Sequence, residues 1–230
     1  MQFNTINLSF LVLIIVSNGL ATDSTLADPD PKRFQSEIDA FNEWDQKNSF
    51  PEDAILFAGS SSIRMWKTHD AFPQYALINR GFGGAHIPDV LYYYADVILK
   101  YEPRLIVFYC GDNDISGNYS VNQVYEDYLE LISKINSDLP DVQFVFISVK
   151  PSGSRWQHWD NMDALNKKIE KYNQEYENLY YVDLATPLLS SDGKPDNDLF
   201  LNDQLHLNDK GYQVWNSILS KMLESIYNKE

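Results

Sequence analysis

The sequence of 230 residues is poor in cysteine, in basic side chains and in long apolar runs. The single cysteine, Cys110, excludes an internal disulfide framework, and its place at the end of an apolar run is typical of a small buried residue. Only 18 Lys and Arg stand against 33 Asp and Glu, which gives a formal net charge of -15. Because such a charge repels nucleic acid and anionic membrane surfaces, we expect neither as a partner.

The longest apolar stretch near the start of the chain, Leu8–Val16, is shorter than the roughly 20 residues that a membrane span requires. Gly19 and Ala21 follow it and suit a signal-peptidase site. We therefore expect residues 1–21 to be a signal peptide and the mature protein to be exported, periplasmic or secreted, without stable membrane insertion. The alternative is a plain N-terminal extension, since this segment contains no Lys or Arg.

The remainder, residues 22–230, has the length and apolar content of one domain with a sizeable core. Short apolar runs alternate with stretches of helical spacing, which is typical of a mostly parallel sheet between helical layers. We expect an α/β fold, a three-layer α/β/α sandwich with about five parallel strands. The predicted strands are 54–58, 75–79, 105–109, 142–148 and 179–182, and the predicted helices are 30–48, 88–100, 121–137, 162–177 and 208–227.

The first predicted strand stops at Gly59 and a cluster of three serines at 60–62. An apolar strand followed by glycine and small hydroxyl residues indicates a tight turn into a helix, which exposes one side chain beside backbone N–H groups. A serine in this place is reactive only if a base removes its proton and donors receive the developing oxyanion. The hypothesis of a nucleophilic serine therefore requires a histidine, an orienting acid and an amide elsewhere in the sequence.

Three further segments supply such groups. Gly81–His86 and Gly111–Asp114 follow predicted strands, and in a doubly wound sheet ligands bind outside the carboxyl ends of the strands. Asp203 and His206 lie in a loop-rich stretch before the last predicted helix, where the carboxylate can orient the imidazole. The order Ser, Asp, His is that of α/β hydrolases, although no serine lies in a GxSxG pentapeptide.

Together these segments resemble the sequence blocks of the SGNH hydrolases, also called the GDSL esterases and lipases. Gly59-Ser60-Ser61 stands where the family has Gly-Asp-Ser, so the resemblance implies Ser61 as the nucleophile, with Ser60 replacing the usual Asp. The segment 79–84 is similar to the family's glycine loop, which implies the N–H of Gly84, or of Gly83 as the fallback, as a donor to the oxyanion.

The remaining two blocks complete the resemblance. Gly111–Asp114 is similar to the family's GxND, which implies the side-chain amide of Asn113 as a further oxyanion donor beside the N–H of Ser61. Asp203 and His206 match the family's DxxH as orienting acid and base. The resemblance thus implies a flavodoxin-like SGNH fold and a Ser-His-Asp esterase that uses no cofactor and no metal.

The substrates that the resemblance implies are small carboxylic esters, such as short-chain acyl esters, acetylated sugars or lysophospholipids. No strongly apolar lid segment is present, which favours small or soluble esters. His86 follows the glycine loop, and Arg155 and Trp156 lie in a loop after the fourth predicted strand. We expect these three residues as candidate substrate contacts.

Three alternatives remain open at this point. A flavodoxin-like binding module would cradle phosphate at residues 59–62, but it would leave Asp203 and His206 without a role. A catalytically silent relative would bind carbohydrate or another protein, and Ser60 in place of Asp is the feature that permits it. Asp112 and Asp114 suggest a glycosidase, although they lie too close in sequence to flank a glycosidic bond.

Overall fold

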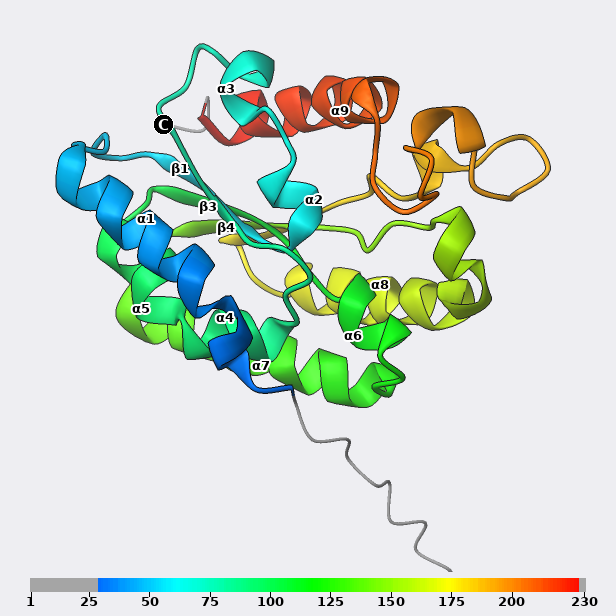
Figure 1. The fold of residues 1–230 in the computed structure, drawn as a ribbon, viewed down its shortest axis with the longest axis horizontal. Helices are drawn as coiled ribbons and strands as arrows, with labels where there is room; N and C mark the ends of the chain where they lie inside the picture. The colour runs from blue at the N-terminus through cyan, green and yellow to red at the C-terminus, as the bar shows by residue number, and fades with distance from the viewer. Residues whose placement is uncertain (1–28, 228–230) are drawn as a thin grey trace, which may run out of the picture.

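A computed structural model describes residues 29–227, so the predicted signal peptide at 1–21 lies outside the described residues. Five strands form one parallel sheet in the order β2-β1-β3-β4-β5. The strands are β1 (Ile55–Gly59), β2 (Leu77–Gly81), β3 (Leu105–Tyr109), β4 (Gln143–Ile147) and β5 (Leu179–Val182). Helices cover both faces of this sheet, which confirms the predicted three-layer α/β/α sandwich (Figure 1).

One face of the sheet carries the longer series of helical segments. These are η1 (Pro31–Phe34), α1 (Gln35–Lys47), α4 (Ile87–Tyr92), α5 (Tyr94–Val97), η2 (Leu99–Tyr101), α6 (Asp112–Ser116), α7 (Val121–Asp138) and α8 (Trp159–Asn173). The other face is covered by α2 (Ser61–Arg64), α3 (Thr68–Ala71) and α9 (Asp209–Tyr227). Short turns η3 (Gly153–His158), η4 (Thr186–Leu188) and η5 (Asn197–Leu199) lie in the connections that follow β4 and β5.

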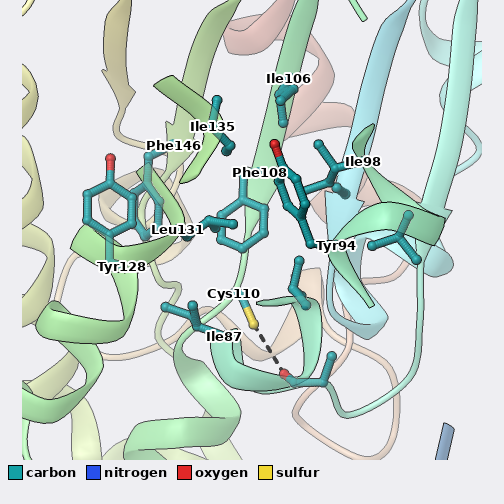
Figure 2. Packing of buried hydrophobic residues seen from close by; sticks show 14 of the residues in the cluster. Ile87, Tyr94, Ile98, Ile106, Phe108, Cys110, Tyr128, Leu131, Ile135 and Phe146 are labelled. Atoms are coloured by element: carbon teal, nitrogen blue, oxygen red, sulfur yellow. Dashed lines mark hydrogen bonds between the residues drawn. The ribbon is translucent and has the colours of Figure 1, made fainter. Parts of the chain in front are cut away.

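Alternate residues of each strand enter different halves of the core, because successive side chains of a strand point to opposite faces. Phe108 of β3 packs on the α7 face, whereas its neighbours Val107 and Tyr109 pack on the α9 face. Figure 2 shows Phe108 surrounded by Tyr128 of α7 and Tyr94 of α5. Since both faces are covered, all five residues of β3 are buried, as its uninterrupted apolar run predicts.

The prediction of one continuous helix at 88–100 is wrong, because the structure divides the segment into α4, α5 and η2. Tyr93 and Ile98 have non-helical backbone angles at the two breaks. The residues at both breaks are buried: Tyr93 and Tyr94 at the first, and Val97 and Ile98 at the second. The apolar spacing of this segment is therefore spread over three short helical segments instead of one helix.

Two other boundaries differ from the prediction. β2 extends to Gly81, so the first residues of the glycine loop belong to the strand. Asp112–Ser116 forms the short helix α6, which turn-forming residues conceal in the sequence. Within residues 29–227, no helix has the length and apolar character to cross a membrane.

Candidate active site

Three neighbouring strands end at one edge of the sheet. Gly59 at the end of β1 pairs with Gly81 of β2 on one side and with Tyr109 of β3 on the other. The loops after these strands therefore start at the same level, as expected from the rule for doubly wound sheets. This register brings the serine turn, the glycine loop and the segment 111–114 together.

The serine turn depends on Gly59. Its φ of +129° lies in a region that favours glycine, and a Cβ there would approach the backbone oxygen of Tyr109 to 2.0 Å. The next residue, Ser60, donates its backbone N–H to the same oxygen at 2.9 Å, and α2 then begins at Ser61. Glycine thus permits the sharp change of direction that brings Ser61 to the sheet edge.

Ser61 is linked through His206 to Asp203, the two residues that the sequence singles out in the C-terminal loop. Its Oγ lies 2.9 Å from Nε2 of His206, and Nδ1 of His206 lies 2.7 Å from Oδ2 of Asp203. These distances are those of normal hydrogen bonds. Although 145 positions separate Ser61 from His206, the fold joins the three side chains in one series.

Asp203 is held in its ionised form by local hydrogen bonds. Its Oδ1 accepts the backbone N–H groups of Leu205 at 2.9 Å and His206 at 3.0 Å. Partial burial raises the pKa of Asp203, but the hydrogen bonds from His206 and Leu205 outweigh burial and bring the pKa to about 2. The carboxylate therefore remains charged and can stabilise a positive imidazole.

Asn208 closes the loop that carries this pair. Its Nδ2 donates to the backbone oxygen of Phe200 at 2.9 Å, while its Oδ1 accepts the N–H groups of Lys210 and Gly211 at the start of α9. The side chain thus caps α9 and fastens the loop to it. An isolated antiparallel bridge between Phe200 and Leu207 tightens the same loop.

Asn113 in α6 and Gly84 in the loop after β2 lie on either side of the serine turn. Nδ2 of Asn113 donates to the backbone oxygen of Ala85 at 2.9 Å, so one of its two N–H bonds is engaged. Gly84 has φ of +74°, and no heavy atom lies within 4 Å of the position that its Cβ would take. The N–H of Gly83, in contrast, donates to Oε2 of Glu37 at 3.2 Å, which favours Gly84 as the donor.

The predicted substrate contacts lie around this site in different settings. Arg155 in η3 donates to Oδ2 of Asp112 at 2.9 Å and to Oδ1 of Asn113 at 2.8 Å. The ring of His86 meets that of Tyr119 edge to face, with centroids 5.4 Å apart. A role in substrate binding stays a prediction for both residues.

Trp156 borders a separate hollow next to the site. Its ring stacks on that of Trp159 with centroids 6.0 Å apart and an interplanar angle of 13°. Together with Gly153, Ser190, Asp192 and residues 194–198 it lines a cavity of about 540 Å³. Its contact with a substrate likewise stays a prediction.

Lys150 is a buried charged residue that the sequence reasoning missed. Its Nζ lies 3.6 Å from Oδ2 of Asp112 and makes no hydrogen bond with any described residue. Burial lowers the pKa of Lys150, while the nearby Asp112 opposes this effect. The rule that identified the other loops would have found it, because Lys150 follows the carboxyl end of β4.

Asp114 is a second missed feature, since the sequence reasoning weighed it only as half of a carboxylate pair. It is fully buried, and its Oδ1 accepts the backbone N–H of Ile87 at 3.0 Å. Burial raises the pKa of Asp114 to about 8. Its carboxyl group therefore ties the loop after β3 to the start of α4 rather than pairing with Asp112.

Known proteins resemble this chain in sequence pattern and in fold. The GDSL-like Lipase/Acylhydrolase family matches residues 60–214, which is more than half of the chain. No protein of curated function matches the sequence significantly.

Solved structures with a similar fold include a protein of Streptococcus pneumonia named for platelet activating factor, which has a TM-score of 0.74 and 21% identity over 83% of this chain and 93% of that one. A GDSL-like lipase of Bacteroides thetaiotaomicron has a TM-score of 0.70 and 21% identity, and the match covers 86% of this chain and 98% of that one. A carbohydrate esterase family 3 protein of Talaromyces cellulolyticus has a TM-score of 0.60 and 15% identity, and the match covers 76% of this chain and 99% of that one. At these identities the likeness establishes the fold.

Proposed function

Because this chain belongs to the GDSL-like lipase/acylhydrolase family and is thus a carboxylic ester hydrolase, we propose that it cleaves small esters through an acyl-enzyme on Ser61. The observation that carries the proposal is the hydrogen-bonded series from Ser61 through His206 to Asp203, with distances of 2.9 and 2.7 Å. Both distances are within hydrogen-bond reach, as the transfer of a proton from a serine to a histidine oriented by a carboxylate requires, and they support this proposal.

The first half of the reaction acylates the enzyme. As Oγ of Ser61 attacks the ester carbonyl carbon, Nε2 of His206 takes the hydroxyl proton, and ionised Asp203 stabilises the resulting imidazolium. Collapse of the tetrahedral intermediate breaks the bond to the alcohol oxygen, which receives the proton from His206. Water then attacks the acyl-enzyme by the same route and releases the carboxylic acid, so that one ester and one water yield one alcohol and one acid.

The oxyanion is stabilised by three N–H groups in this proposal. They belong to the backbone of Ser61 at the start of α2, to the backbone of Gly84, and to the side-chain amide of Asn113. Ser61 and Asn113 are each only 9% exposed, so these donors act where bulk water screens them little. Loss of the Asn113 amide is expected to lower turnover by about 100-fold to 1000-fold, as for donors of other serine hydrolases.

The proposed substrates are acetylated sugars or other short-chain acyl esters. Solved structures of similar fold include an acetyl esterase and an acetyl-xylooligosaccharide esterase, with TM-scores of 0.61 and 0.60. A net charge of -15 also favours neutral or cationic esters over anionic ones. Export after removal of residues 1–21 is part of the same proposal.

Hydrolysis of p-nitrophenyl esters of increasing acyl length by the wild-type protein and by Ser61→Ala tests this function. We expect activity on the acetyl or butyryl ester, lowered by roughly 10⁴-fold or more in Ser61→Ala. Ser60→Ala is the matched control, because its hydroxyl is buried beside Ser61 and makes no hydrogen bond with a described residue. We expect it to retain turnover within about tenfold, since it removes no group of the proposed relay.

A serine-reactive phosphonate separates the enzyme from a silent relative. An activated Ser61 becomes covalently labelled, and the label disappears in Ser61→Ala and decreases in His206→Ala. Absence of both labelling and ester turnover in the wild-type protein would favour the binding alternatives. Equal turnover by wild type and Ser61→Ala would remove Ser61 as the nucleophile.

A further inference from the structure

Arg155 lies directly behind the proposed oxyanion donor Asn113. One terminal nitrogen of its guanidinium donates to Oδ2 of Asp112 at 2.9 Å, and the other donates to Oδ1 of Asn113 at 2.8 Å. The side chain of Arg155 is 18% exposed and that of Asp112 is 6% exposed. A guanidinium whose two terminal nitrogens each donate a hydrogen bond in a largely buried setting is held in one orientation.

The contacts of Asn113 determine the orientation of its amide completely. Arg155 has only donors, so the atom that it contacts must be the amide oxygen. The backbone oxygen of Ala85 is only an acceptor, so the atom 2.9 Å from it must be the amide nitrogen. The nitrogen therefore keeps one further N–H bond, which is the one that the oxyanion requires.

A cation on the amide oxygen also strengthens the donor at the other end of the amide. Hydrogen bonds polarise one another when they are linked in series in a low dielectric. Oδ2 of Asp112, which accepts the hydrogen bond from Arg155, also lies 3.6 Å from Nζ of the buried Lys150. One carboxylate thus faces two basic side chains beside the point where negative charge develops.

The turn η3 also contacts the loop that carries the base. The backbone N–H of Ser154, next to Arg155, donates to the backbone oxygen of Gln204 at 3.0 Å. Gln204 lies between Asp203 and His206 in the sequence. One short segment therefore touches both the acid-base loop and the oxyanion amide.

From this arrangement we propose that Arg155 is a positioning residue that orients and polarises the Asn113 amide, rather than a direct contact of the substrate. The inference rests on the proposed function, because it assumes that Asn113 serves an oxyanion. It assigns Asp112 the task of holding the guanidinium in place. Since the amide bonds the oxyanion more strongly than it bonds the ground-state carbonyl, the contribution of Arg155 is to kcat.

The test is a double-mutant cycle on hydrolysis of p-nitrophenyl acetate. Arg155→Ala is expected to lower kcat by about 10-fold to 100-fold and to change KM by less than about threefold. In the Asn113→Ala background the same substitution is expected to have almost no further effect on kcat, because the residue through which it acts is gone. Guanidinium ion is expected to restore part of the kcat of Arg155→Ala and none of that of Asn113→Ala.

Two variants control for loss of structure. Arg155→Lys retains a cation but not the pair of parallel donors, so we expect a kcat between those of wild type and Arg155→Ala. Arg104→Ala removes an arginine just before β3, at the opposite end of the sheet, where its guanidinium carbon lies 4.3 Å from the ring centroid of Tyr227. We expect its kcat and KM to equal those of the wild type.

The outcomes distinguish this inference from the proposed function. A higher KM with unchanged kcat in Arg155→Ala would make Arg155 a substrate contact, and an equal loss in both backgrounds would show that it acts independently of Asn113. Either result would overturn the inference about Arg155. The proposed function would still stand if hydrolysis depends on Ser61. A wild-type protein without ester turnover overturns both.

Discussion

At the residue scale, two adjacent serines have the same chemistry and different surroundings. The hydroxyl of Ser60 is fully buried and makes no hydrogen bond with a described residue, whereas that of Ser61 is 2.9 Å from an imidazole nitrogen. A hydroxyl without a base nearby is a weak nucleophile. The contact with His206 therefore favours Ser61, and a serine in place of the family's Asp leaves the hydrogen-bonded series intact.

Asp203→Asn is expected to lower kcat by roughly 10³-fold to 10⁴-fold, because the neutral amide does not stabilise the imidazolium.

The pKa of Asp203 is lowered from 3.8 to about 2, so the ionised form stabilises the fold. This contribution is present above the unfolded value and is lost as the pH falls through the folded value.

Urea unfolding of wild type and Asp203→Asn at several pH values measures this contribution. We expect the difference in unfolding free energy to shrink as the pH falls from about 4 towards about 2. A difference that stays the same over this range would contradict the proposed hydrogen bonding of the ionised carboxylate.

At the element scale, the strands that carry the site end in register, and polar side chains connect the loops that follow them. Asp114 at the start of α6 accepts the backbone N–H of Ile87 at the start of α4. The contact joins the loop after β3 to the loop after β2, which contains Gly84. The positions of the two proposed oxyanion donors are thus mechanically linked.

Asp114→Asn is expected to change how stability depends on pH. Burial raises the pKa of Asp114 from 3.8 to about 8, so the folded protein favours the protonated carboxyl. Its contribution to stability is fully present below the unfolded value and is lost as the pH rises through the folded value. We therefore expect the stability of wild type relative to Asp114→Asn to fall between about pH 4 and about pH 8.

Urea unfolding of both proteins at intervals over this range checks the prediction. Asn is nearly isosteric with protonated Asp and does not titrate. The Asp114→Asn variant is therefore the reference against which the titration of Asp114 is measured. Parallel stability curves for the two proteins would mean that Asp114 is ionised in the fold at neutral pH.

Sequence patterns predict the strands well because local rules govern them, and they identify the segments of Ser61, Asp203 and His206, whose side chains the structure joins by hydrogen bonds. β3 and β5 coincide with the predicted runs, since strands covered on both faces are continuously apolar. The partners of Arg155 and Lys150 are not predicted, because they depend on the path of the loop after β4. No spacing rule relates that loop to Asp112, which lies about 40 positions earlier.

At the scale of the whole molecule, a chain with an excess of acidic side chains carries a site that is proposed to accept uncharged esters. A net charge of -15 produces a negative potential that extends about one Debye length into solution. This potential repels an anionic substrate before it reaches Ser61 and leaves a neutral one unaffected.

The ionic-strength dependence of hydrolysis measures this repulsion. For the mono-p-nitrophenyl ester of succinic acid, which carries a free carboxylate, kcat/KM is expected to rise several-fold between about 0.02 M and about 0.2 M NaCl. For p-nitrophenyl acetate it is expected to stay constant. A decrease for the anionic ester would instead indicate a positive binding site for its carboxylate.

The order of the groups along the chain has a consequence for synthesis. Ser61, Gly84 and Asn113 belong to the first half of the sequence, whereas His206 follows β5 and is fastened by Asn208 to α9. A nascent chain on the ribosome therefore displays the nucleophile and its oxyanion donors long before the base emerges. Ser61 gains its proposed base only when α9 packs against the sheet and holds the loop of His206 in place. During most of translation the Ser61 hydroxyl is therefore unreactive.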